Sequence, residues 1–155
     1  MKVEIKGFEK FKIWKNRNGF VVDDIEKIIQ TSLSNVSLMY WCKGTNGPNP
    51  LRKKMIYEFS KRIAEKGKFR LVMSVNDWTN RGEVELYANE ILRLWRDRND
   101  LRSTDMSKHV GFSHTYYLQI ENGKEPNEEF KKNIEAFTKG FVKASFWDDD
   151  KKDLE

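Results

Sequence analysis

The sequence of 155 residues contains one cysteine, two histidines and three prolines. A lone cysteine cannot form an internal disulfide, and Cys42 with two histidines cannot supply the ligands of a Cys-rich zinc site. The acidic residues Asp23, Asp24, Glu26 and Glu58 show no recognisable spacing of metal ligands, or of a nucleophile and its base. The sequence therefore predicts no metal, no cofactor and no catalytic residues, and a protein that is not an enzyme.

Long apolar runs are also missing. No stretch of about 18 apolar residues is present, which excludes a membrane-spanning helix. Residues 1–6 lack the apolar stretch of a secretory signal. We therefore expect a cytoplasmic protein that makes no contact with a membrane.

Aromatic residues, in contrast, are plentiful. Ten Phe, five Trp and five Tyr supply the large apolar groups of a hydrophobic core, and the length suits one domain or two small ones. The formal net charge of +5 permits binding to a polyanion but does not by itself indicate it.

The first 80 residues predict a small mixed αβ module. Apolar residues alternate with polar ones near the start, and Asn18-Gly19 favours a tight turn, so we expect a strand or hairpin over residues 8–22. A helix is predicted after Asp23 and Asp24, a short strand over 36–41, and a loop over 43–50. A helix over 51–66 that stops at Gly67 and a buried strand over 69–75 complete the order strand, helix, strand, helix, strand. The polar run 76–82 is the expected boundary, with helix resuming at Glu83.

The later part of the chain predicts short helices with tight breaks. One helix ends near Asn99-Asp100, a second closes at Val110-Gly111, and Ser113 caps a third that ends at Asn122-Gly123. Two short helices joined by a turn at a glycine are typical of a helix-turn-helix. The side chains expected to point inward and lock the two helices are Met106, Val110, Tyr117 and Ile120, with the small Ser107 between them.

This segment resembles the Xre/Cro/phage-repressor family of helix-turn-helix domains over about 50 of the 155 residues. The resemblance is carried by Leu92, Arg96, Leu101, Met106, Val110-Gly111, Ser113, Tyr116-Tyr117, the run from Gln119 to Lys124, and Pro126. It implies an all-α helix-turn-helix domain over 83–145, so together with the αβ module of residues 1–80 the sequence predicts an α+β chain.

The resemblance also implies which residues meet DNA. Base contacts fall on His114, Thr115 and Gln119, and an exposed Leu118 would touch a thymine methyl unless the rest of the protein buries it. Phosphate contacts fall on Ser113, Asn122 and Lys124, to which we add Lys108. Arg96 and Glu121 correspond to an ion pair that joins the first and third helices of such domains.

Two other features have competing interpretations. His114 has no neighbouring nucleophile in the sequence, so we favour a DNA contact over a catalytic role, and we expect His109 to be solvated. A basic cluster is either a second phosphate-binding face or an ordinary solvated helix surface balanced by Glu58 and Glu65. The cluster comprises Arg52, Lys53, Lys54, Lys61, Arg62, Lys66, Lys68 and Arg70.

The function predicted first is a sequence-specific, double-stranded DNA-binding transcriptional regulator, repressor-like, of a bacterium, phage or mobile element. Such domains bind two-fold sites as dimers, so we expect a homodimer. The first module would dimerise, sense a ligand or bind a protein partner. The alternatives are an antitoxin or phage-encoded inhibitor that holds a protein partner through its first module and, less favoured, a nuclease that acts on DNA.

Overall fold

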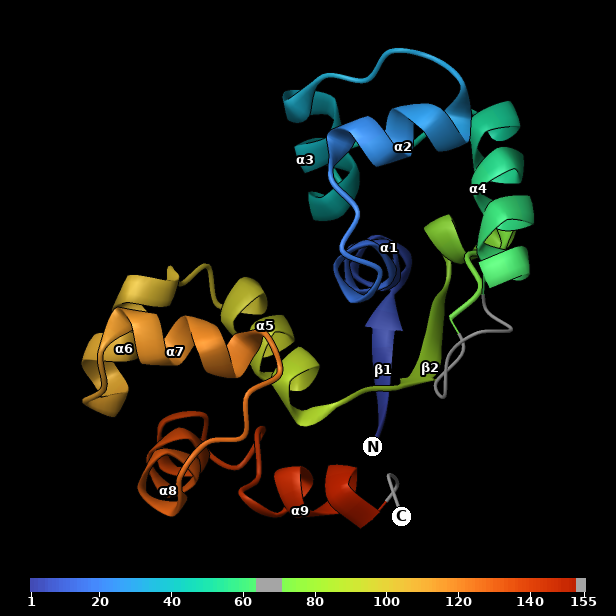
Figure 1. The fold of residues 1–155 in the computed structure, drawn as a ribbon. Helices are drawn as coiled ribbons and strands as arrows, with labels where there is room; N and C mark the ends of the chain where they lie inside the picture. Colours follow the sequence, from blue (N-terminus) through green and yellow to red (C-terminus); the bar gives the residue numbers. More distant parts are fainter. Residues whose placement is uncertain (64–70, 153–155) are drawn as a thin grey trace. The chain divides into compact units, whose positions relative to one another are not determined.

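The computed structural model describes residues 1–63 and 71–152, and it divides the chain into two compact units. The N-terminal unit spans Lys2–Glu85, and the C-terminal unit spans Leu86–Glu155 together with Met1. Within the described residues there are nine α-helices, one 3-10 helix and two strands, so the chain is a mostly helical α+β protein (Figure 1).

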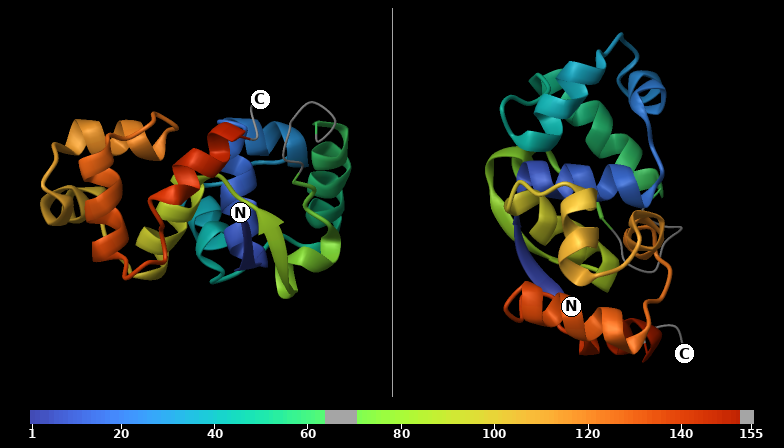
Figure 2. Two further views of the ribbon diagram at one scale, coloured as in Figure 1. Left: turned by 90° about the horizontal axis from the view of Figure 1, so that it is seen from below. Right: turned by 90° about the vertical axis from the view of Figure 1, so that its left-hand side faces the viewer.

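The described part of the N-terminal unit combines four α-helices, a 3-10 helix and a two-stranded sheet. Its elements are β1 (Lys2–Lys6), α1 (Gly7–Arg17), α2 (Val22–Ile29), α3 (Asn35–Lys43), α4 (Pro50–Ile63), the 3-10 helix η2 (Val75–Thr79) and β2 (Arg81–Glu85). The strands run antiparallel and lie side by side, with Lys2 opposite Glu85 and Lys6 opposite Arg81 (Figures 1 and 2). The first and the last element of the unit are therefore paired with each other.

The hairpin expected over residues 8–22 is wrong, because this segment forms α1. Phe11 and Trp14, three residues apart, both lie in the core, which is helical spacing. The Glu9 carboxylate accepts a hydrogen bond from the Lys6 backbone N–H at 2.8 Å and thereby satisfies the start of the helix. Asn18-Gly19 does form a turn, with Gly19 at φ 66°, but it joins α1 to α2.

Two further strands predicted in this unit are also wrong. Residues 36–41 belong to α3, which begins after Ser34, whose hydroxyl accepts a hydrogen bond from the Ser37 backbone N–H. Of the strand expected over 69–75, residues 71–74 have no regular structure and Val75 begins η2; the remaining two residues lie outside the described part, as does Gly67. The helix start expected at Glu83 lies inside β2. The sheet therefore has two strands rather than three in the described residues.

The helix predicted after Asp23 and Asp24 is confirmed as α2, and the one predicted from residue 51 is confirmed as α4 as far as Ile63. Between α3 and α4 the chain forms the predicted loop. The buried face of α4 carries Ile56 and Ser60, which are fully buried, while Met55 is only half-buried.

Aromatic rings fill the core of the N-terminal unit. Phe11 lies at the centre, with its ring centroid 4.7 Å from that of Trp78, 6.0 Å from that of Trp14 and 6.2 Å from that of Trp41. The indole N–H groups of Trp14 and Trp78 are buried and have no hydrogen-bond partner in the described part of the chain. The burial of apolar surface, rather than hydrogen bonding, therefore stabilises the positions of these rings.

The C-terminal unit consists of helices: α5 (Ala88–Arg98), α6 (Ser103–Val110), α7 (His114–Glu121), α8 (Glu128–Phe137) and α9 (Ser145–Lys152), which can be followed in two further views in Figure 2. Their core is built from Leu92, Met106, Val110, Tyr117, Ile120, Phe130 and Ile134, all at most 2% exposed. Lys131 is also buried, and its ammonium group contacts the carboxylates of Glu125, Glu128 and Asp148 at 3.1 to 3.5 Å. Burial opposes the charge of Lys131, but these carboxylates outweigh it and raise the pKa.

Among the helices of the described residues, none is both long and apolar enough to cross a bilayer.

Candidate functional site

The segment α6–α7 is a pair of short helices joined by a tight turn. Gly111 ends α6 at φ 77°, in the left-handed region, and its N–H donates to the Ser107 carbonyl at 3.0 Å. Two residues later the Ser113 hydroxyl accepts a hydrogen bond from the Tyr116 backbone N–H at 3.1 Å and caps α7. Three residues, 111–113, therefore join the two helices.

The inner face of this pair is fixed by burial. Met106 and Val110 from α6 meet Tyr117 and Ile120 from α7, and each is at most 2% exposed. Ser107 is 6% exposed, and its hydroxyl donates to the Thr104 carbonyl at 2.9 Å, so it fits between the helices without an unpaired polar group. Burying each of these large side chains stabilises the unit by about 1.5–3 kcal/mol.

The outer face of α7 carries the four residues that the sequence predicted as base contacts. His114, Thr115, Leu118 and Gln119 are all exposed. They follow one another at helical spacing, so they lie on one side of α7, away from Tyr117 and its core neighbours. Leu118 is 36% exposed, so it is not buried by other parts of the chain.

Two of these residues, His114 and Gln119, contact neighbouring polar side chains. The Nε2 atom of His114 lies 2.7 Å from the hydroxyl oxygen of Ser103 at the start of α6. The Lys124 ammonium group donates to the side-chain oxygen of Gln119 at 3.3 Å and lies 5.1 Å from the ring centroid of Tyr116. His114 and Gln119 are therefore oriented before any partner arrives, and Lys124 is already engaged.

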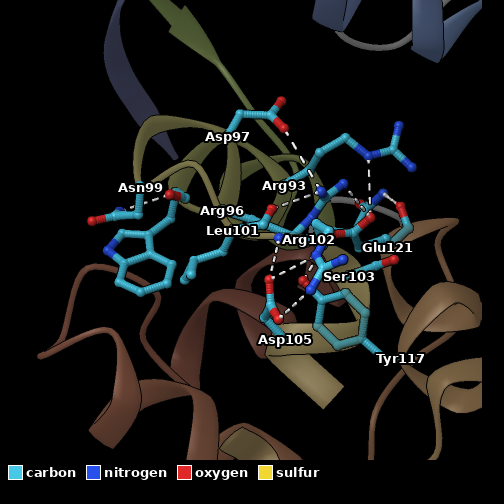
Figure 3. A network of polar contacts seen from close by, with 12 residues as sticks. Arg93, Arg96, Asp97, Asn99, Leu101, Arg102, Ser103, Asp105, Tyr117 and Glu121 are labelled. Carbon is cyan, nitrogen blue, oxygen red and sulfur yellow. Dashed lines mark hydrogen bonds and ion pairs between the residues drawn. The ribbon is translucent and has the colours of Figure 1, made fainter. Parts of the chain in front are cut away.

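A buried ion pair fixes α7 against α5. The Arg96 guanidinium donates to both carboxylate oxygens of Glu121, at 2.5 Å and 3.1 Å, and also to the Leu101 carbonyl (Figure 3). The Tyr117 hydroxyl donates to the same carboxylate at 2.7 Å. The pair expected between Arg96 and Glu121 is present, with the Glu121 side chain 1% exposed and that of Arg96 18% exposed.

The ionisation of this network follows from its surroundings. Burial alone would lower the pKa of Arg96, but the hydrogen bonds and the charge of Glu121 outweigh it and raise the pKa. Burial, followed by the nearby Glu121 carboxylate, raises the pKa of Tyr117, so its hydroxyl stays protonated and remains a donor. The network is therefore a fixed structural element at neutral pH.

Polar residues that the sequence analysis missed complete the support of α6 and α7. The Asn89 amide donates to the Glu121 carbonyl, and the Asn133 amide donates to the Val110 carbonyl, both at 2.9 Å. These bonds satisfy carbonyls at the two helix ends. Arg93 lies 3.5 Å from Glu121 and donates to the side chain of Asn122 at 3.2 Å. No spacing signal marks such long-range partners in the sequence.

The predicted phosphate contacts lie around α7. Ser113 and Asn122 stand at its two ends, and Lys108 lies on α6; all three are exposed, as is Lys124. Asn122 is held by Arg93, and Ser113 by its capping bond. Among the described residues Lys108 makes no hydrogen bond or ion pair, although its charge acts on the Asp105 carboxylate.

His109 is exposed, as expected, and one face of its ring also packs against an aromatic ring. Its ring stacks on that of Phe137 at 4.4 Å between centroids, with an interplanar angle of 18°. Trp95 meets the same Phe137 ring edge-on at 5.3 Å. His109 therefore helps to attach α8 to α6 and takes no part in the exposed face of α7.

The described residues hold no group of three or more His, Cys, Asp or Glu side chains that could bind a metal ion. Comparison with protein-family models, with curated proteins and with solved structures found no match. The chemistry available at the exposed face of α7 consists of an amide, a hydroxyl, an imidazole and an apolar side chain. Such a face can donate and accept hydrogen bonds and make an apolar contact.

Proposed function

We propose that the C-terminal unit is a helix-turn-helix domain that binds double-stranded DNA and that the protein is a cytoplasmic transcriptional regulator of a bacterium, phage or mobile element. The single observation that carries this proposal is the exposed face of α7, formed by His114, Thr115, Leu118 and Gln119 on a rigid buried support. The sequence resemblance to the Xre/Cro/phage-repressor family supports it.

The proposed mechanism is docking of α7 in the major groove without a chemical step. The Gln119 amide donates and accepts together, so it suits adenine, while Leu118 suits the methyl group of thymine. His114 and Thr115, at the start of α7, contact neighbouring base edges. When Gln119 binds a base, the hydrogen bond between its side-chain oxygen and the Lys124 ammonium group breaks. Lys124 is then available to contact a phosphate.

One such domain buries a limited surface, so we propose that the protein binds a two-fold site as a homodimer. The N-terminal unit then dimerises or binds a further partner.

The test is selection of duplexes from a random pool by the full-length protein, followed by affinity measurements on the selected and a scrambled duplex. Gln119→Ala should reduce the ratio of the two affinities by about 5- to 150-fold, which corresponds to roughly 1–3 kcal/mol per base contact. Lys124→Ala should weaken binding to both duplexes and lower the salt slope by about one. Ser145→Ala, an exposed change at the start of α9, is the control and should leave the ratio unchanged. Equal affinity of the wild type for both duplexes would refute the proposal.

A further inference from the structure

Positive charge is concentrated in the unit that does not contain α7. Residues 2–85 contain 17 Lys and Arg against 10 Asp and Glu, a formal charge of +7, whereas residues 86–155 contain 12 against 14, a formal charge of −2. Duplex DNA carries about one negative charge per 1.7 Å of its axis, so affinity for it depends on cations that neutralise phosphates. The C-terminal unit supplies few of them.

The surroundings of α7 confirm this shortage. The helix contains no Lys or Arg, and its one acidic residue is the buried Glu121. Arg93 and Arg96 both contact Glu121 and are already engaged, so the cations expected to meet phosphates around α7 are Lys108 and Lys124. A domain with this face can read bases, but its contribution to phosphate neutralisation is small.

In the N-terminal unit, exposed cationic side chains lie on one face of α4. Lys54, Lys61 and Arg62 are all exposed, and their spacing of seven and eight residues places them on one face of this helix. Lys54 and Lys61 are about 10 Å apart along the helix axis. Glu58, the one carboxylate of α4, lies on the same face, so three cations stand against one acid.

The structure shows no acidic partner for these cations among the residues it describes. Within the described residues, Lys54, Lys61 and Arg62 form no ion pair with a carboxylate. Lys61 and Arg62 instead lie over aromatic rings of their own helix, 5.6 Å from the ring centroid of Tyr57 and 5.5 Å from that of Phe59, respectively. Glu65, the other acid near this cluster in the sequence, lies outside the described residues, as do Lys66, Lys68 and Arg70.

We propose that the exposed face of α4, defined by Lys54, Lys61 and Arg62, binds the phosphate backbone of double-stranded DNA without regard to base sequence. Ammonium and guanidinium groups on flexible stems donate hydrogen bonds to phosphate oxygens and act as point or planar charges. The identity of the polyanion rests on the function proposed above. Under this division, α7 supplies sequence preference and α4 supplies a large part of the salt-dependent affinity.

An anionic membrane is the competing partner for a basic helix. A helix that binds a membrane surface buries its own apolar face in the lipid. The apolar face of α4 is not available, because Ile56 is fully buried in the core of the unit and Ser60 beside it donates and accepts within the unit. The structure therefore favours a rigid, regularly charged polymer over a bilayer.

The experiment compares two full-length triple variants that lose the same charge. The first, Lys54→Gln, Lys61→Gln and Arg62→Gln, removes the α4 face; the control, Lys2→Gln, Lys27→Gln and Lys43→Gln, removes three exposed lysines elsewhere in the same unit. Binding to a fluorescent 20-base-pair duplex of random sequence is measured by anisotropy over a series of KCl concentrations. The first variant should lower the slope of log affinity against log salt by about 2 to 3, since each phosphate contact contributes about 0.9. The control should lower it by less than about one.

An unchanged slope in the first variant would overturn the proposal. Equal losses in both variants would also overturn it, because binding would then follow net charge and not the α4 face. Loss of binding to phosphatidylserine vesicles with an unchanged duplex slope would assign the face to a membrane. Because the duplex has a random sequence, this result does not depend on base contacts by α7. The two proposals can therefore fail separately. If Gln119→Ala keeps normal specificity while the α4 variant lowers the salt slope, only the base-reading role of α7 is refuted. Circular dichroism of each variant checks that it is folded.

Discussion

Removing the guanidinium of Arg96 should be among the most damaging single changes in the C-terminal unit. Arg96→Met leaves the Glu121 carboxylate, whose side chain is 1% exposed, with the Tyr117 hydroxyl and the more distant Arg93 as its side-chain partners. Breaking a buried pair by removing one partner costs about 3–5 kcal/mol. Because the Arg96 side chain is 18% exposed, we expect the lower end, about 3 kcal/mol. In a unit of this size each kcal/mol lowers the melting temperature by roughly 4–8 °C, so the expected loss is roughly 12–24 °C.

The assay is thermal unfolding of a variant series, followed by circular dichroism. Arg102→Met is the matched control, because the Arg102 side chain is 81% exposed in its contact with Asp105 and its loss should cost less than about 1 kcal/mol. The triple variant Arg96→Met, Glu121→Leu and Tyr117→Phe removes the ion pair together with the hydroxyl that would otherwise lose its acceptor, and it should recover most of the lost stability. If Arg96→Met costs no more than Arg102→Met, or if the triple variant is no more stable than Arg96→Met, the reasoning about an uncompensated buried charge is wrong.

Two other perturbations test the backbone and the electrostatics. A Cβ on Gly7 would collide with the backbone carbonyl of Asp77, whereas one on Gly82 meets nothing within 4 Å, so Gly7→Ala should cost about 2 kcal/mol or more and Gly82→Ala less than about 0.5 kcal/mol. The two urea unfolding midpoints check this, and similar midpoints would contradict it. The backbone N–H of Arg102 and then its side chain lower the pKa of Asp105, and a carboxylate with a lowered folded-state pKa adds stability above its unfolded pKa that is lost as pH falls through the folded value. The difference in melting temperature between the wild type and Asp105→Ala should therefore shrink from pH 6 to pH 3, and a constant difference would count against this role.

The sequence predicts the helices α6 and α7 correctly because several local signals of helix ends and helix faces coincide there. Ser113 caps α7 by its side chain, Gly111 takes the left-handed conformation that ends α6, and Tyr117 and Ile120 repeat at helical spacing. The partners of Asn89 and Asn133 lie 32 and 23 residues away, so no local pattern could have indicated these bonds. Likewise, the contact between Ser103 and His114 exists only because the turn brings two helix starts together.

The N-terminal unit was harder to predict because its apolar runs are short. Phe11 and Ile13 fit an alternating strand pattern, but Phe11 and Trp14 equally fit a helix, and the aromatic core decides between them. Residues 36–41 are rich in groups that favour strands, yet the Ser34 cap starts a helix that buries Leu38 and Trp41. Strand β2 contains Gly82 and three charged residues, a composition that gives little strand signal, and it forms through pairing with β1.

The pairing of Lys2 with Glu85 gives the N-terminal unit a property that bears on protein engineering. Its chain enters and leaves at neighbouring positions on adjacent strands, so the whole segment of residues 2–85 is a closed insert. A segment whose ends are neighbours can be transplanted into an exposed turn of an unrelated host without stretching that host. The same geometry makes this unit exchangeable as a cassette.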